Sequence, residues 1–212
     1  MSTESKRRPY DSRARRAQAH RNRATILRSA RDRFLADGYA ATTIAAIADD
    51  AQLSIDTVYK TFGGKGGLVR AIYEESLLGT GPTAAPVRSD QLQNSEADPH
   101  AIVRGWGVLT AEVAPLVAPV HLLVREAAAS DPEMAALLRD SDDSRRTRMH
   151  HNALTLAERG LMKAGVTVKE ATDVMWAFSA PELFDLLVLR AGWSPERFGT
   201  YIGEFLESAL LS

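Results

Sequence analysis

No cysteine occurs among the 212 residues of the sequence, which excludes a disulfide scaffold, a zinc site built on thiolates and a cysteine nucleophile. The basic N-terminal residues are not followed by an apolar stretch, which is unlike a secretory signal peptide. No uninterrupted apolar run approaches about twenty residues, the length that a membrane-spanning helix needs. We therefore expect a soluble, cytoplasmic protein with no membrane partner.

The sequence also lacks the motifs of the common catalytic sites. It contains no glycine-rich phosphate loop, no Gly-x-Ser-x-Gly and no His-Glu-x-x-His. The adjacent His150 and His151 point to different sides of a helix, which is a poor arrangement for one metal ion. We therefore expect no enzyme activity, no metal site and no cofactor.

The net charge of −1 conceals an uneven distribution of charge along the chain. Residues 1–33 contain eleven Lys or Arg and three acidic residues, a net charge of +8, so the other 179 residues carry −9. A basic segment of this kind favours a polyanionic partner, either nucleic acid or an anionic membrane surface. The alternative is a disordered arm that only aids solubility.

Helical periodicity dominates, because the sequence has no long alternation of apolar and polar residues. An all-α fold is predicted, with a helix over residues 19–37 that ends at Gly38. Residues 79–99, with three prolines and two glycines, are expected to form a flexible loop. Pro181 is expected to kink a helix over residues 167–191. The remaining predicted helices cover residues 43–50, 54–61, 65–78, 100–114, 116–129, 131–163 and 194–211.

A helix-turn-helix pattern occupies residues 42–59. Thr43 and Ser54 are placed to cap the two short helices, and Leu53 fills the turn between them. The apolar residues at helical spacing are Ile44, Ile47, Ala48 and Ala51 in the first helix and Val58 with Phe62 in the second. Because Ser54 caps the second helix, the next three residues lie in the turn that such a helix places toward base edges in the major groove.

The pattern extends on both sides of this motif with a fixed order and spacing. The residues that carry it are Ile26, Leu27, Phe34, Gly38, Tyr39, Thr42, Thr43, Ile44, Ile47, Ala48, Ala51, Leu53, Ser54, Thr57, Val58, Tyr59, Phe62, Lys65 and Leu68. On these residues the sequence resembles the TetR family of transcriptional regulators. The resemblance implies a homodimer that binds a palindromic operator in double-stranded DNA and is released by a small-molecule effector. We expect a basic disordered arm over 1–18, the helix-turn-helix DNA-binding domain over 19–66, and a helical effector-binding and dimerisation domain over 67–212.

Two positions depart from the family pattern. Gln52 stands in the turn where the family usually has glycine, so we expect a side chain held there in a left-handed conformation. Gly66 and Gly67 occupy the first turn of the fourth helix, where the family often has an acidic residue and better helix formers. These two glycines are interpreted either as a hinge of a conformational switch or as a poorly formed turn without function.

Short polar and cationic side chains at helix N-termini suit phosphate groups, whereas the exposed flank of the second helix suits base edges. Phosphate contacts are assigned to Thr43, Thr57, Tyr59 and Lys65, with Ser54 and Arg21 beside them in the DNA-binding surface. Base contacts are assigned to Ile55, Asp56, Lys60 and Thr61. The arginines assigned to minor-groove and backbone contacts are Arg13, Arg15, Arg16, Arg21 and Arg23.

The C-terminal half provides candidates for a dimer interface and an effector site. The last predicted helix carries an apolar stripe, with Gly199 and Gly203 allowing another helix to approach closely. Dimer contacts are assigned to Phe184, Leu187, Phe198, Tyr201, Ile202 and Phe205, although the same stripe is equally consistent with a monomer core. Effector contacts, which need apolar walls with a few polar groups, are assigned to Trp106, Leu122, Arg125, Met149, Asn152, Trp176, Phe178 and Glu182.

The leading hypothesis is a homodimeric repressor that an effector releases from its operator. A constitutive or architectural DNA-binding protein without an effector is the main alternative. A protein that binds membrane surfaces through its basic N-terminal helix is a third reading, which leaves the helix-turn-helix unexplained.

Overall fold

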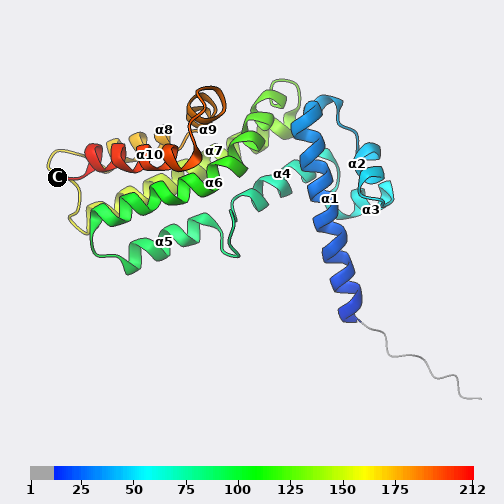
Figure 1. Cartoon of the computed structure of the whole chain (residues 1–212), viewed down its shortest axis with the longest axis horizontal. Coiled ribbons are helices and arrows are strands. Elements are labelled where there is room, and N and C mark those ends of the chain that lie inside the picture. Colours follow the sequence, from blue (N-terminus) through cyan, green and yellow to red (C-terminus); the bar gives the residue numbers. More distant parts are fainter. Residues whose placement is uncertain (1–11) are drawn as a thin grey trace, which may run out of the picture.

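The computed structural model describes residues 12–212, and every regular element in that range is a helix (Figure 1). The prediction of an all-α fold is therefore confirmed for this part of the chain. In order, the elements are α1 (Ser12–Ala41), α2 (Ile44–Asp50), α3 (Ile55–Phe62), α4 (Lys65–Ser76), α5 (Ala85–Ser95), α6 (Pro99–Ala127), α7 (Pro132–Glu158), α8 (Val168–Phe178), α9 (Pro181–Phe184), the π-helix η1 (Asp185–Arg190) and α10 (Pro195–Leu210).

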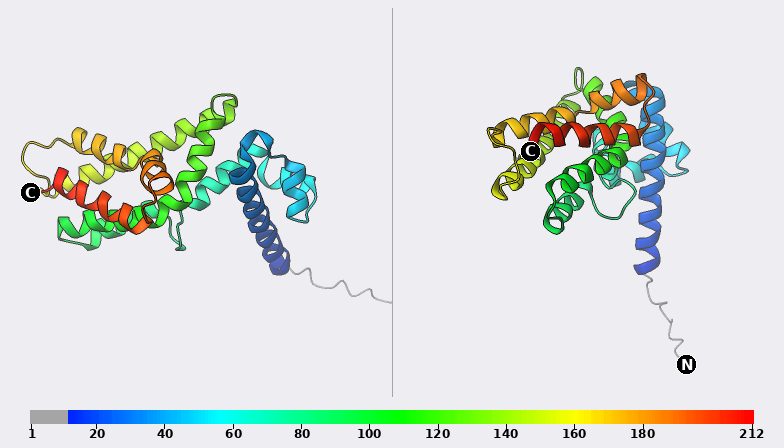
Figure 2. Two further views of the ribbon diagram at one scale, coloured as in Figure 1. Left: turned by 45° about the horizontal axis from the view of Figure 1, so that its top comes forward. Right: turned by 60° about the vertical axis from the view of Figure 1, so that its left-hand side comes forward.

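The molecule has a small head of α1–α4 and a larger body of α5–α10 (Figure 2). The head core contains Ile26, Phe34, Ile47, Val58, Leu68 and Val69, and it also includes Val120, Leu123, Met134 and Leu137 from α6 and α7. A second core fills the body between α6, α7, α8 and α10. Because one end of α6 and of α7 belongs to the head core, the head and the body are joined by shared apolar packing as well as by the chain.

Helix α1 is longer than the sequence predicted. It begins at Ser12, so residues 12–18 are helical and the expected disordered arm is wrong for them, whereas residues 1–11 lie outside the described part. In Figure 1 the N-terminal half of α1 projects past α2 and α3. Gly38 has φ of 80°, so the regular helix ends there as predicted, even though helical hydrogen bonding resumes as far as Ala41.

Residues 79–99 were expected to form a loop, and this is wrong because they contain α5. Pro86 lies in the first turn of this helix, where its missing N–H breaks no helical hydrogen bond. The Glu112 carboxylate on α6 holds the start of this segment: it accepts hydrogen bonds from Arg88 Nη1 at 2.8 Å and from the Thr80 backbone N–H at 2.8 Å. These bonds, the Arg88 guanidinium first, lower the pKa of Glu112 from 4.5 to about 2.

Replacing Glu112 with glutamine is expected to reduce stability at neutral pH and to have progressively less effect in acid. The folded state depresses the Glu112 pKa, so its contribution is complete above 4.5 and disappears as the pH falls toward 2. Urea midpoints of the parent protein and Glu112→Gln at pH 7 and pH 3 measure this. Glu126→Gln, at an exposed site on the same helix, is the control. An equal difference between parent and Glu112→Gln at both pH values would show that the carboxylate charge is not responsible.

Helix α6 runs through Pro115 and Pro119, although a break was predicted near residue 115. Among the described residues, α6 is the helix whose length and apolar composition would be enough to cross a membrane. Core helices of soluble proteins meet the same criterion, and α6 packs against α10, α7, α9 and α5. Its apolar surface is thus the central layer of the body.

The predicted helix over residues 167–191 is divided into three elements. Pro181 starts α9 instead of kinking a continuous helix, and α8 ends at Phe178. Arg145 on α7 supports this break, because its Nη1 donates to the Trp176 carbonyl oxygen at 2.6 Å and to Ser179 Oγ at 3.0 Å. The backbone groups that the interruption frees are therefore partly satisfied by a side chain from another helix.

Gly199 and Gly203 allow the close approach that was predicted, and the partner is α6 of the same chain. A Cβ atom at Gly199 would collide with the Gly107 carbonyl oxygen and would lie 2.6 Å from Ala111 Cβ. Phe198, Ile202 and Phe184 are buried in the body core beside this contact. Their assignment to a dimer interface is therefore wrong, because the protomer itself already covers them.

Candidate DNA-binding surface and ligand cavity

The turn between α2 and α3 is built by two hydroxyl caps and one left-handed residue. Thr43 Oγ1 accepts from the Ala46 N–H at 3.1 Å, and Ser54 Oγ accepts from the Thr57 N–H at 3.1 Å. Gln52 has φ of 53°, as its place in the turn predicted. Ile47 and Val58 are buried and anchor the two helices on the head core. The motif therefore presents the opposite face of α3 to solvent.

Two large apolar side chains are exposed on α3, Ile55 at 47% and Tyr59 at 50%. Between them Asp56 Oδ2 and Lys60 Nζ form an ion pair at 2.7 Å, and this contact raises the pKa of Lys60. Thr61 Oγ1 donates to the Thr57 carbonyl oxygen at 2.7 Å. The exposed face of α3 thus combines apolar contact area with an ion pair. Either side chain of this pair can exchange its partner for a hydrogen bond to a base edge.

Lys65 lies where the head meets the body. Its Nζ is 4.3 Å from the centre of the Tyr39 ring and 3.5 Å from the Ala40 carbonyl oxygen, and burial lowers the pKa of Lys65. The Tyr39 hydroxyl donates to Asp131 Oδ2 at 2.8 Å. Asp131 also caps α7, and these hydrogen bonds, the one from Tyr39 first, lower its pKa. Lys65 is therefore fixed at the end of the surface that Thr43 and α3 form.

Helix α1 adds exposed arginines to the head, and one of them lies against the end of α3. The guanidinium of Arg23 lies 4.7 Å from the centre of the Phe62 ring at the end of α3. Arg21 is exposed one turn from the core, with its Nη2 donating to Gln18 Oε1 at 2.5 Å. Arg13, Arg15 and Arg16 are exposed on the projecting turns of α1.

The glycine pair in the first turn of α4 has a packing role at one position. A Cβ atom at Gly67 would collide with the Phe62 carbonyl oxygen, which belongs to the backbone and cannot move aside easily. A Cβ atom at Gly66 would meet the Glu133 carboxylate, the flexible end of a side chain. Gly67 thus allows α3 and α4 to approach closely, a role that neither sequence-based interpretation included.

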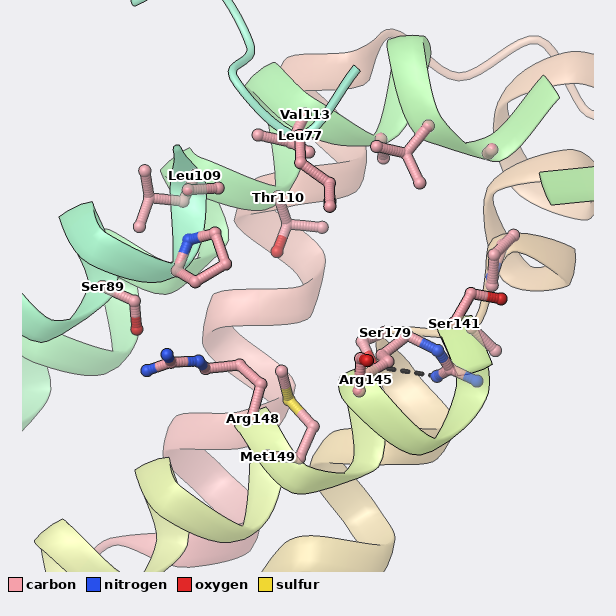
Figure 3. Close-up of a pocket in the computed structure, with 18 of the residues that line it drawn as sticks. Leu77, Ser89, Leu109, Thr110, Val113, Ser141, Arg145, Arg148, Met149 and Ser179 are labelled. Atoms are coloured by element: carbon pink, nitrogen blue, oxygen red, sulfur yellow. Dashed lines mark hydrogen bonds between the residues drawn. The ribbon is translucent and has the colours of Figure 1, made fainter. Parts of the chain in front are cut away.

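A cavity of about 410 Å³ lies inside the body, between α4, α5, α6, α7, α8 and α10. In Figure 3, Leu77, Leu109 and Val113 approach it from one side, and Arg145, Arg148 and Met149 approach from α7 on the other. The wall is mostly apolar, and its polar groups include Ser89, Thr110, Ser141 and Ser179. A space of this size suits a small organic molecule.

Four of the residues assigned to the effector site lie in this wall: Trp106, Met149, Asn152 and Phe178. Four others do not, because Leu122 faces elsewhere, Trp176 packs against Arg145 and Arg146, and Arg125 pairs with Glu182 at the surface. Wall residues that were not predicted come from α4 and its C-cap: Arg70, Tyr73, Glu74 and Leu77. These residues stand at positions i, i+3, i+4 and i+7, so they lie on one face of the helix. This helical spacing is the signal that could have identified them.

The sequence model for bacterial regulatory proteins of the tetR family matches residues 26–72, which span the end of α1 through most of α4. The head of this chain is thus a TetR-family domain. The matched segment contains the caps, the turn and the exposed face of α3 described above. This TetR-family protein is therefore a transcriptional regulator, and its fold gives it a DNA-binding head and a separate helical body.

Solved structures share the fold of this TetR-family chain over most of its length. The SmeT–triclosan complex has a TM-score of 0.71 at 18% identity and covers 90% of this chain and 92% of its own. NalD, the secondary repressor of the MexAB-OprM multidrug efflux pump in Pseudomonas aeruginosa, has a TM-score of 0.71 at 16% identity, covering 92% and 98%. A transcriptional regulator from Saccharomonospora viridis in complex with choline has a TM-score of 0.66 at 20% identity, covering 90% and 97%. No curated protein matches the sequence of the TetR-family chain.

Proposed function

We propose that this TetR-family protein is a homodimeric repressor that binds a palindromic operator and is released by a small-molecule effector in the body cavity. The observation that carries the proposal is the placement of α4. One face of α4 packs into the head core through Leu68 and Val69, and another lines the cavity through Tyr73 and Leu77. An occupant that displaces α4 therefore changes the position of the head, and ligand and DNA weaken each other by the same factor.

The roles proposed for the DNA-binding residues follow from their local geometry. The Thr43 hydroxyl accepts a backbone N–H, and its own proton remains for a phosphate oxygen. Ser54 and Thr57 share one hydrogen bond, 2.8 Å between their hydroxyl oxygens, which leaves one of the two protons for phosphate. Ile55 suits the methyl group of thymine, and Asp56 and Lys60 suit cytosine and guanine respectively.

The dimer is proposed to form through the surface of η1 and α10. Leu186 and Leu189 are 53% and 54% exposed, and Tyr201 on α10 is also exposed. Leu187 and Phe205, which the sequence also predicted as dimer contacts, are partly buried. Exposed leucines on adjacent elements favour a second copy of the same surface, related by twofold symmetry.

The structural neighbours support the proposed regulation in two respects. Two of them were solved with a small molecule, triclosan in one and choline in the other, and a third is named as a repressor. The cavity described here gives this chain space for such a molecule. A constitutive DNA-binding protein, the alternative, does not need a cavity bordered by the helix that supports the head.

A DNA-binding regulator of this kind is proposed to act in the cytoplasm.

Selection from random double-stranded DNA with the full chain tests this function. The expected result is a palindromic site that binds much more tightly than scrambled DNA and with a steep dependence on salt concentration. Sedimentation of the complex is expected to give two protein chains per palindrome. Equal binding to selected and scrambled DNA would instead support an architectural role.

The projecting turns of α1 are expected to contact phosphates beside the operator. Residues 12–25 of α1 precede the first core side chain, Ile26, a length of about 21 Å of helix. Replacing Arg13, Arg15 and Arg16 together with alanine is expected to reduce the slope of log K against log salt by about one for each lost contact, without changing the selected sequence. Gel-shift titrations at several salt concentrations measure the slope. Replacing the exposed Arg139 of the body is the control, and an unchanged slope in the triple variant would leave these arginines without a role in DNA binding.

A further inference from the structure

We propose that the cavity takes an uncharged, mostly apolar molecule whose polar group donates a hydrogen bond, such as a phenol or an alcohol. This inference rests on the proposed role of the cavity as the effector site and adds the chemical class of the ligand. Two features of the wall carry it: the pairing of its charged side chains and the direction of its hydroxyl hydrogen bonds.

Each arginine of the wall already has a carboxylate partner. Arg70 Nη2 lies 3.1 Å from Asp140 Oδ2, and Arg145 Nη2 lies 3.1 Å from Asp142 Oδ1. Arg148 Nη1 pairs with the Asp90 carboxylate of α5. Among the described wall residues, no cation is thus left to neutralise a carboxylate or phosphate on a ligand. An anionic ligand would lose its hydration without gaining a partner.

The carboxylates of the wall are equally unsuited to a cationic ligand. Asp140 is paired with Arg70, and Glu74 lies at an exposed position on α4. Most of the wall is formed by apolar side chains, of which Trp106, Leu109, Val113 and Phe178 are examples. An ammonium group that entered this region would therefore be desolvated with no free carboxylate beside it.

Three hydroxyl groups of the wall donate their protons to backbone carbonyl oxygens three or four residues earlier in the chain. Thr110 Oγ1 donates to the Trp106 carbonyl oxygen at 2.8 Å, and Ser141 Oγ donates to the Leu138 carbonyl oxygen at 2.8 Å. Ser179 Oγ donates to the Trp176 carbonyl oxygen at 3.0 Å. A hydroxyl whose proton is used in this way offers only its lone pairs to the cavity. A donor on the ligand matches these three hydroxyls, and the buried Trp106 Nε1–H, which has no hydrogen-bond partner among the described residues, matches an acceptor. A hydroxyl group on the ligand provides both.

Four probes of the same shape separate the chemical classes. These are 4-phenylphenol, biphenyl, biphenyl-4-carboxylate and the trimethylammonium derivative of biphenyl, titrated into the full chain at pH 7 by calorimetry without DNA. The phenol is expected to bind at least tenfold more tightly than the carboxylate and the ammonium compound, about 1.4 kcal/mol for each factor of ten. The proposal is wrong if either charged probe binds as tightly as the phenol, or if none of the four binds.

Substitution of the carboxylate partners tests the pairing of the charged side chains. Asp90→Asn leaves Arg148 without its carboxylate and is expected to raise the affinity for the carboxylate probe about tenfold, with little change for the phenol. Asp140→Asn, which frees Arg70, provides a second test of the same idea should Asp90→Asn fail to fold. No gain for the carboxylate in a folded variant would contradict the charge argument.

Thr110→Val removes the lone pairs of one hydroxyl with almost no change in shape. It is expected to weaken binding of the phenol several-fold and to leave biphenyl unchanged. Thr155→Val is the matched control, because Thr155 Oγ1 makes the same kind of bond, to the His151 carbonyl oxygen at 3.0 Å, outside the wall. Equal losses for phenol and biphenyl would show that Thr110 acts only through packing.

Addition of the phenol to the complex with the selected operator separates the two proposals. If the phenol binds but the operator stays bound, the proposed ligand class is supported and the proposed release by an effector is wrong.

Discussion

Replacing Gly199 with alanine is expected to lower the free energy of unfolding by about 1–3 kcal/mol, the usual cost of an added atom in a tightly packed contact. The new Cβ atom would collide with the Gly107 carbonyl oxygen and press on Ala111, so α10 must move away from α6. This movement would disturb the apolar core around Phe198 and Ile202. The effect is large because α10 packs along α6 through backbone atoms at this point, which have no rotamers to change.

Gly203 is the matched control on the same face of α10, one helical turn further on. A Cβ atom there would lie 3.5 Å from the nearest atom, Arg104 Cα, which is an ordinary contact distance. Since glycine costs about 1 kcal/mol relative to alanine inside a helix, Gly203→Ala is expected to leave stability unchanged or to increase it. Urea unfolding followed by circular dichroism measures both. A loss of stability of the same size in the two variants would mean that the crossing point of α6 and α10 lies elsewhere.

Replacing Lys65 with alanine is expected to weaken binding to the selected operator about tenfold and to reduce the salt slope by about one. The side chain is held at the start of α4 by the Tyr39 ring and the Ala40 carbonyl oxygen, so its ammonium reaches phosphate with little loss of side-chain entropy. Fluorescence anisotropy with labelled operator at several salt concentrations gives both quantities.

Two variants show whether Lys65 acts as a phosphate contact. Lys169→Ala removes a lysine at an exposed position of the body and is expected to change neither quantity. Tyr39→Phe keeps the ring under Lys65 but removes the hydrogen bond to Asp131, so it separates the support of the lysine from the link between head and body. A Lys65→Ala protein that binds more weakly with an unchanged salt slope would indicate a structural role.

The helix-turn-helix was predictable because its determinants are local. Ser54 caps α3 through a backbone N–H three residues away, and Ile47 and Val58 are spaced to reach one core. The left-handed backbone of Gln52 also followed from its position in the turn. Each of these features depends on neighbours within a few residues, so the sequence alone carries enough information.

The body was less predictable because tertiary contacts decide where its helices begin and end. Residues 79–99 appear as a loop by composition, yet Glu112 on α6 holds this segment in place and Gln93 is buried on α5. Proline at 115 and 119 predicted a break in α6 that packing against neighbouring helices overrides. At residue 181 the opposite occurs, because Arg145 from α7 satisfies backbone groups where α8 ends.

The cavity wall could be predicted only in part for the same reason. Trp106 and Asn152 face it, whereas Arg125 and Glu182 find each other at the surface, a pairing that spacing along the chain does not reveal. The contribution of Tyr73 and Leu77 was missed because every residue assigned to the effector site came from residues 106–182, although the expected effector-binding domain began at residue 67. Helix α4 has two faces, one in the head core and one in the cavity wall.

These two faces of α4 have a consequence for engineering new sensors from this scaffold. Wall residues on α6 and α8, such as Leu109 and Phe178, pack on the body core and lie outside the head core, so varying them changes which compound is detected. Tyr73 borders both regions, since it lines the cavity and packs on the head core. A library that varies the first set and keeps Tyr73 fixed would alter ligand preference while the strength of the response to binding is preserved.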